Sequence, residues 1–156
     1  MARRASQPRN EIVLTHPTPI IEAALKTKQQ PFTVQSERRA LRDIPGPSLT
    51  FRETIVIGEA AILGWIDRRY PLPSLFPADI DSYAKAATLA HALENDPSQA
   101  RGLFDLITSP QHIHNFLLGA SPTIADLALQ LALEKVDPDA AEQFGDALYR
   151  QTDAVF

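Results

Sequence analysis

The stretch from Gly46 to Pro71, GPSLTFRETIVIGEAAILGWIDRRYP, combines two short apolar runs with a helical pattern and decides the fold. The runs 47–51 and 54–57 are separated by only two residues, a spacing that favours an antiparallel hairpin over a crossover connection. Apolar residues then recur at helical spacing over 60–69, and Pro71 is a residue type that ends a helix. The stretch therefore predicts a hairpin followed by a helix.

The chain before this hairpin predicts a strand, a helix and a second strand. Residues 11–15 are β-branched and apolar and run into two prolines, which indicates a buried strand followed by a turn. Apolar residues repeat at helical spacing over 20–28, with Pro19 suited to a first helical position. Residues 31–34 predict another strand. We expect residues 11–70 to form a small α/β lobe with the element order βαβ-ββα.

The rest of the chain contrasts with this lobe because its pattern is helical. Residues 71–78 are rich in proline and are expected to form a linker between two lobes. Four later segments carry apolar residues at helical spacing, at 79–94, 99–107, 124–136 and 139–150. We expect residues 79–156 to form an all-α domain, and residues 1–10 to form a disordered tail.

The composition argues against several classes of function. The 156 residues contain no cysteine, which rules out disulfides, thiolate metal ligands and a cysteine nucleophile. The formal net charge of −4 argues against a nucleic-acid binder, because phosphate binding needs a concentrated basic face. No apolar run approaches the ~20 residues that span a membrane. We expect a cytoplasmic protein that binds neither nucleic acid nor membrane.

Motifs that usually carry chemistry are missing or weak. The sequence has no glycine-rich phosphate loop, no Gly-x-Ser-x-Gly turn and no His-Glu-x-x-His zinc motif. His112 and His114 form a His-x-His pair, but no cysteine or clear third acidic ligand accompanies them. An ordinary interhelical loop is therefore favoured over a metal site, and we predict no metal.

Two blocks, in this order, resemble the glutathione S-transferase (GST) family. The first is 46–71, which is similar to the family's Val-Pro-x-Leu strand, its hairpin and a helix with the pattern AAIL-x-Y-L-D-x-R-Y-P. The second is SPTIADLAL at 121–129, which is similar to the P-S-x-A-D start of a buried helix. Physically, this second block predicts a capping box between Thr123 and Asp126. The resemblance implies an N-terminal thioredoxin-like lobe followed by a GST C-terminal-like helical domain.

The resemblance also implies where a glutathione site would lie. Pro47 matches the family's cis-proline, whose backbone edge faces the cysteinyl group of glutathione, and Ser48 follows it. The family's thiol-activating residue lies just after the first strand, where this chain has His16 and Thr18. We take Thr18 and His16 as candidate catalytic residues, and Pro47, Ser48 and Glu59 as candidate glutathione-binding residues.

Two departures from the family pattern weigh against ordinary glutathione binding. Members that bind glutathione carry Glu-Ser or Asp-Ser before the Ala-Ala-Ile helix start, where these groups hold the γ-glutamyl end. Here the two positions are Gly58 and Glu59, and the Glu59 carboxylate would repel the γ-glutamyl carboxylate. The segment 35–46 is also shorter than the family's second helix, which walls one side of the groove.

Three hypotheses for the function follow. The first is a GST-like protein with a degenerate glutathione site, acting as a protein-interaction or ligand-binding module with a protein partner or a second copy of itself. The second is an atypical glutathione-dependent transferase or isomerase in which Thr18 or His16 activates the thiol. The third is a reduced fold stabilised by a larger partner. We favour the first, which is not an enzyme, and glutathione is the one cofactor that the resemblance suggests.

Overall fold

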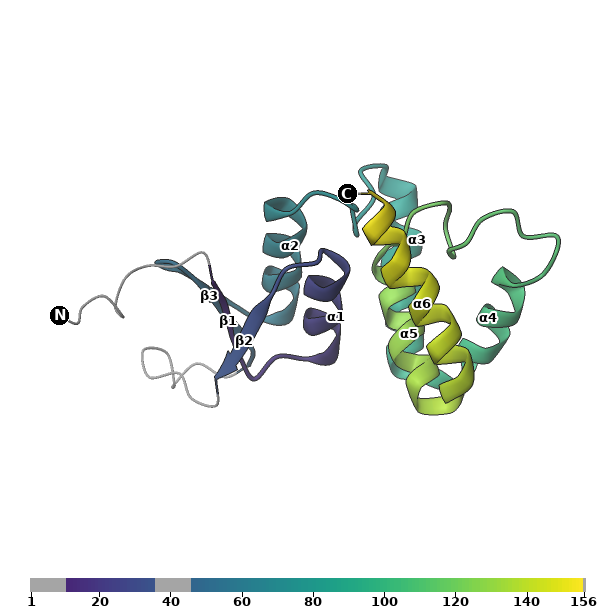
Figure 1. Cartoon of the computed structure of the whole chain (residues 1–156), viewed down its shortest axis with the longest axis horizontal. Helices are drawn as coiled ribbons and strands as arrows, with labels where there is room; N and C mark the ends of the chain where they lie inside the picture. Colours follow the sequence, from purple (N-terminus) through teal and green to yellow (C-terminus); the bar gives the residue numbers. More distant parts are fainter. Residues whose placement is uncertain (1–10, 36–45, 156) are drawn as a thin grey trace.

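The computed structural model describes residues 11–35 and 46–155, with side chains described up to Tyr149 (Figure 1). The N-terminal part contains β1 (Ile12–Thr15), α1 (Pro19–Thr27), β2 (Phe32–Gln35), β3 (Ser48–Phe51), β4 (Thr54–Ile57) and α2 (Glu59–Arg69). It is followed by α3 (Ile80–Asn95), the 3₁₀ turn η2 (Pro97–Gln99), α4 (Ala100–Ile107), α5 (Ile124–Val136) and α6 (Pro138–Val155). The predicted tail 1–10 and most of the short segment 35–46 lie outside the described residues.

The N-terminal lobe is a mixed sheet with the strand order β2-β1-β3-β4. β1 pairs in parallel with β2, whereas the β1–β3 and β3–β4 pairs are antiparallel. Parallel neighbours require a crossover, which α1 provides, and α1 and α2 lie on the side of the sheet that faces the other helices (Figure 1). Leu14 and Leu49 of the sheet share one buried cluster with Ile21 of α1 and Ile62 of α2. The predicted βαβ-ββα lobe is confirmed.

The second part of the chain is all helical, as predicted, and α5 lies at its centre. Every residue from Ile124 to Gln130 is buried, because α5 packs against α3, α4, α6 and also α1 of the first lobe. The predicted capping box at the start of α5 is confirmed, with Thr123 at the N-cap and Asp126 as its partner. Within the described ranges, no helix combines the length and apolar character needed to cross a membrane.

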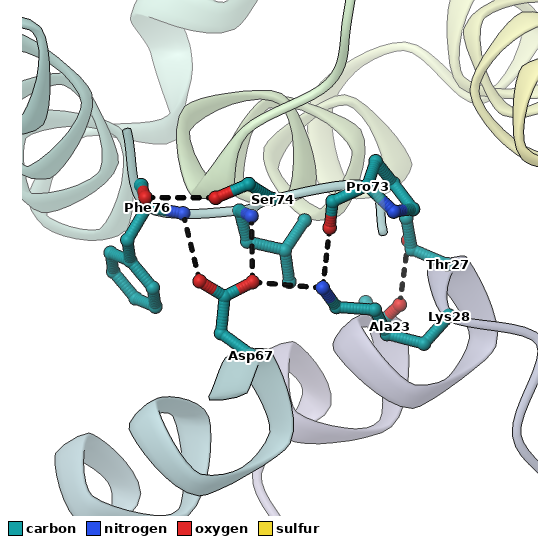
Figure 2. A network of polar contacts seen from close by, with 8 residues as sticks. Ala23, Thr27, Lys28, Asp67, Pro73, Ser74 and Phe76 are labelled. Carbon is teal, nitrogen blue, oxygen red and sulfur yellow. Dashed lines mark hydrogen bonds and ion pairs between the residues drawn. The ribbon is translucent and has the colours of Figure 1, made fainter. Parts of the chain in front are cut away.

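The proline-rich connection between the lobes is fastened by a buried ion pair. The Lys28 Nζ, at the end of α1, donates to Asp67 Oδ1 of α2 at 2.8 Å and to the Pro73 carbonyl (Figure 2). Asp67 also accepts from the backbone N–H groups of Leu75 at 2.8 Å and Phe76 at 3.4 Å. The Lys28 side chain is fully buried, and burial lowers its pKa while Asp67 opposes that shift. One carboxylate thus ties α1, α2 and the connection together.

Candidate functional site

Three parts of the sequence meet at one edge of the sheet. The strand register places Thr15, at the end of β1, opposite Ser48, at the start of β3, and Ser48 opposite Ile57, at the end of β4. The turn that leads into α1 and the first residue of α2, Glu59, follow directly from these strand ends. The edge therefore gathers the candidate residues that the sequence singled out.

Thr18 occupies the N-cap of α1 but does not use its side chain to cap the helix. Its backbone carbonyl accepts from the N–H groups of Ile21 at 3.1 Å and Glu22 at 3.3 Å. The Thr18 Oγ1 is buried and has no hydrogen-bond partner among the described residues. A buried hydroxyl is normally hydrogen-bonded, so this oxygen is an exception among the described residues.

Ser48 resembles Thr18 in this respect. Its side chain is 1% exposed and its Oγ has no partner among the described residues. The neighbouring Pro47 uses its carbonyl to accept from the Gly58 N–H at 2.9 Å, which ties the start of β3 to the N-cap of α2. Pro47 and Ser48 therefore lie beside the start of α2.

The expectation of a cis peptide bond at Pro47 is wrong. Among the described residues, the cis peptide bond is Leu72–Pro73, in the connection between the lobes. The turn before Pro47 is made by Gly46, whose φ of 103° is readily adopted by glycine and not by other residues. The chain therefore changes direction at Gly46 without a cis bond at the proline.

Two neighbouring cavities lie between the lobes and share Ile20, Glu59 and Glu94 in their lining. The larger cavity, of about 520 Å³, runs between α2 and α3. The smaller cavity, of about 290 Å³, lies between the start of α1, the end of α3 and α5, and Thr18 contributes to its wall. The structure thus brings Thr18 and Glu59 into one cavity.

The other catalytic candidate, His16, takes a different place. It lies in the turn between β1 and α1 with φ of 52°, its side chain is exposed, and it lines neither of these two cavities. Of the two residues after β1, Thr18 is the one that the fold directs to the cavity.

Carboxylates from both lobes face the shared space between the cavities. Glu59 opens α2 and Glu94 lies near the end of α3. Glu94 is an exposed residue, but its carboxyl is partly desolvated, and its pKa is raised above its usual range first by this desolvation and then by the negative charge of Glu59, while His91 opposes the rise. Sequence reasoning missed Glu94 because a glutamate near the end of an alanine-rich helix has the pattern of a solvated surface residue.

The far end of the larger cavity has a different character. Phe76 and Tyr83 contact each other there with ring centroids 5.8 Å apart, and Arg68 also lines this end. Asp67 lines it too, but its carboxylate is engaged by Lys28 and by the backbone of the connection. The larger cavity therefore has carboxylates at one end, aromatic rings and a guanidinium at the other, and the apolar residues Ile20, Leu63 and Ile124 between.

No group of three or more His, Cys, Asp or Glu side chains suited to a metal ion is found in the part of the chain that the structure describes. The rings of His112 and His114 lie 6.3 Å apart, and the His112 Nε2 is 3.0 Å from the Phe116 carbonyl. This pair belongs to the loop between α4 and α5.

Solved structures share this arrangement of a four-stranded lobe and an all-α domain. A glutathione S-transferase from Rhodospirillum rubrum F11 matches with a TM-score of 0.64 at 16% identity, over 90% of this chain and 91% of that one. A glutathione transferase homologue from Burkholderia GL BGR1, with bound glutathione, matches with a TM-score of 0.60 at 17% identity, over 92% and 96%. The chain has the glutathione S-transferase fold. A bacterial maleyl pyruvate isomerase, a Zeta-class glutathione S-transferase, matches with a TM-score of 0.61 at 17% identity, over 91% and 95%.

The sequence itself matches no family profile and no curated protein. In this example of the glutathione S-transferase fold, the capping box of α5 also positions the cavity wall. The fully buried Asp126 accepts from the N–H groups of Leu117 at 2.9 Å and Thr123 at 2.8 Å, and burial raises its pKa to about 6. The next residue after the N-cap, Ile124, donates its N–H to the Leu75 carbonyl at 2.9 Å and lines the larger cavity.

Proposed function

We propose that this chain is a ligand-binding module with the glutathione S-transferase fold and a degenerate glutathione site, rather than a transferase. The observation that carries the proposal is the pair of carboxylates, Glu59 and Glu94, that line both interlobe cavities. The fold alone does not assign an activity, since one scaffold supports many functions. The proposal therefore rests on the charges of the cavity.

The charge argument concerns the γ-glutamyl end of glutathione, which carries a carboxylate. By the family resemblance this end would lie beside Glu59, at the start of α2. Two like charges at ~4 Å repel by about 1 kcal/mol in water and by about 4 kcal/mol at the effective dielectric of a protein surface. Glu94 adds a second negative charge from the opposite lobe. We infer that glutathione binds weakly or not at all.

Calorimetric titration with reduced glutathione tests this proposal. We expect no saturable heat at millimolar glutathione with the unmodified chain. The variant Glu59→Gln keeps the shape of the side chain and removes its charge, so it should bind glutathione more tightly than the parent. Submillimolar binding to the parent chain would overturn the proposal of a degenerate site.

A second candidate function is an atypical glutathione-dependent transferase or isomerase. The observation that favours it is that Thr18, which follows β1, is among the residues that line the smaller cavity, since a threonine hydroxyl can donate to a thiolate. The solved structures with this fold include one with bound glutathione and one maleyl pyruvate isomerase. Glutathione-dependent turnover that falls in Thr18→Ala and persists in Thr18→Ser would establish this alternative.

The proposal includes a protein partner or a second copy of the chain, and a cytoplasmic location. Apolar side chains at the connection and at the start of α3 support a partner: Leu72 is 57% exposed, Ile80 78% and Tyr83 47%. Analytical ultracentrifugation and thermal melting check this part. A concentration-independent monomer with a cooperative melt would exclude a fold that depends on a partner for its stability.

A further inference from the structure

Arginine and aromatic side chains gather where the β3–β4 turn meets the end of α2. Phe51 is the last residue of β3 and Arg52 follows it in the turn, while Arg69 and Tyr70 lie at the end of α2. The guanidinium carbon of Arg52 is 5.1 Å from the centroid of the Phe51 ring, and that of Arg69 is 5.3 Å from the same centroid. One ring thus brings two guanidinium groups together. These four residues, the arginine–aromatic cluster, line neither interlobe cavity.

The aromatic rings give the two arginines an ordered base. Phe51 is 6% exposed, and its ring centroid lies 5.5 Å from that of Trp65. Trp65 contacts Tyr70 edge to face at 6.1 Å. The guanidinium carbon of Arg69 also lies 5.5 Å from the Tyr70 ring centroid, so this side chain lies against two rings. A guanidinium that is already ordered by stacking loses less conformational freedom when it binds a ligand.

The chemistry of a stacked guanidinium favours a carboxylate ligand. Its face contacts the ring, whereas its N–H donors point outward in its own plane. Arg52 and Arg69 are both exposed, and Arg69 forms no ion pair with any residue that the structure describes. A carboxylate matches this planar fork and binds it through two parallel hydrogen bonds. The cluster is therefore suited to a ligand that carries carboxylate groups.

The backbone at Arg52 indicates that this side chain has a role beyond the turn. Its φ is 56°, in the left-handed region that glycine adopts readily and arginine does not. Two-residue hairpin turns favour glycine or asparagine where φ is positive. Because backbone strain of this kind concentrates at functional sites, an arginine in this position supports a role in binding.

The surroundings of the cluster favour an acidic peptide over a free anion or a nucleic acid. Leu72, two residues after Tyr70, is 57% exposed and offers a contact to an apolar side chain. Side chains two residues apart in an extended segment lie on one face, about 6.6 Å from each other, so two carboxylates can reach two guanidiniums that share one ring. A nucleic acid needs a wider basic face, and the formal net charge of the chain is −4.

We propose that the arginine–aromatic cluster docks an extended acidic segment of a protein partner. Carboxylates two residues apart in that segment bind Arg52 and Arg69, and an apolar side chain packs against Leu72. The inference rests on the proposed function for the presence of a protein partner, and it gives that partner a chemistry. The cluster lies at the opposite end of β3 from Ser48, so it is separate from the candidate glutathione site.

Titration with the capped hexapeptide Ser-Glu-Ser-Glu-Leu-Ser tests the proposal. The same peptide with glutamine in place of glutamate, and inorganic phosphate, are the comparison probes. Trp65 is the one tryptophan of the chain and contacts Phe51, so its fluorescence reports binding at the cluster. We expect saturable binding of the acidic peptide that weakens with added salt, weaker binding of phosphate, and no saturable binding of the glutamine peptide.

Two variants test the two arginines. Arg69→Gln should weaken binding of the acidic peptide about fivefold, the upper range for an exposed ion pair. Arg52→Gly should weaken it by a similar factor and yet melt no lower than the parent, because glycine adopts the positive φ. Arg101→Gln is the matched control, since Arg101 is an exposed arginine of α4 in the helical domain, and it should bind the peptide as the parent does.

Several outcomes would overturn the docking site. These are equal affinity for the acidic and glutamine peptides, equal affinity for the acidic peptide and phosphate, and equal affinity of the parent, Arg69→Gln and Arg52→Gly for the acidic peptide. Titration of glutathione on the same samples checks the proposed function separately. A failure of peptide binding leaves the degenerate glutathione site in place, whereas glutathione binding below millimolar concentration overturns that site and not the docking site.

Discussion

Lys28 and Asp67 are 39 residues apart in the sequence, and their side chains meet at 2.8 Å between α1 and α2. The ammonium group of Lys28 is fully buried and the carboxylate of Asp67 nearly so, at 13% exposed. Because the same carboxylate also holds the backbone of the connection, this contact fixes the position of the connection between the lobes. The connection in turn carries Phe76, a wall residue of the larger cavity.

Replacing Lys28 should destabilise the protein strongly. Lys28→Met keeps the length of the side chain but leaves the Asp67 carboxylate without its cation, a change that costs about 3 kcal/mol or more for a buried pair. Urea unfolding monitored by circular dichroism measures the difference in unfolding free energy between Lys28→Met and the parent. Arg101→Ala is the control, because Arg101 is 64% exposed in its ion pair with Asp137 and its loss should cost at most about 1 kcal/mol. A similar loss of unfolding free energy in the two variants would contradict a stabilising role for the buried ion pair of Lys28 and Asp67.

The carboxyl group of Asp126 should make stability fall as the pH rises from about 4 to about 6. Burial raises its pKa from 3.8 to about 6, so the folded chain holds the proton more tightly than the unfolded chain does. The stability that Asp126 contributes is fully present below its pKa in the unfolded chain, and it is lost as the pH rises through its pKa in the folded chain. Urea unfolding across this range should show a larger fall for the parent than for Asp126→Asn. Parallel curves would show that Asp126 titrates normally.

Removing the charge of Glu59 should lower the pKa of Glu94. The negative charge of Glu59 is the second cause of the raised Glu94 pKa, after burial. In Glu59→Gln the Glu94 carboxyl should therefore titrate at a lower pH than in the parent, although burial keeps part of the shift. NMR titration of the side-chain carboxyl carbons measures this change. An unchanged Glu94 titration would mean that the two carboxylates do not share the cleft.

Two helical glycines should respond differently to alanine. At Gly102 of α4 an added Cβ meets open space, so Gly102→Ala should stabilise the protein by about 0.5 to 1 kcal/mol through helix propensity. At Gly145 of α6 the added Cβ would lie 3.0 Å from the Nε2 of the buried Gln130, which donates to Glu134 and would have to shift to make room. Gly145→Ala should therefore lack this gain. The melting temperatures of the two variants measure this difference. An equal rise in both would show that Gln130 moves aside at no cost in stability.

Local patterns in the sequence predict the elements of this fold well. The two-residue turn between β3 and β4 and the capping box of Thr123 and Asp126 depend on neighbouring residues, and both are found in the structure. Pro47 shows the limit of carrying over a family feature, because the residue that matches the family's cis-proline has no cis peptide bond in this structure.

Contacts between distant segments could not be predicted. Lys28 lies at the end of a predicted helix, where a lysine usually extends into solvent, and nothing near it in the sequence indicates burial against Asp67. In the same way, nothing near Glu94 in the sequence indicates a functional role. Its interaction with Glu59 depends on the fold. The sequence therefore predicted the candidate site residues that follow β1 and precede α2. It did not predict those that the helical domain contributes.

The contacts of Asp67 also bear on how this chain can be recombined with others. A chimera that joined the N-terminal lobe to a foreign helical domain at Tyr70 would lose the Pro73 carbonyl and the Leu75 and Phe76 amides, which are partners of Lys28 and Asp67. Lys28 and Asp67 would then keep only each other in a site built for five groups. A seam after Phe76 would keep all five groups together, but it would cost the contacts of Leu75 with Ile124 and of Phe76 with Tyr83 in the helical domain.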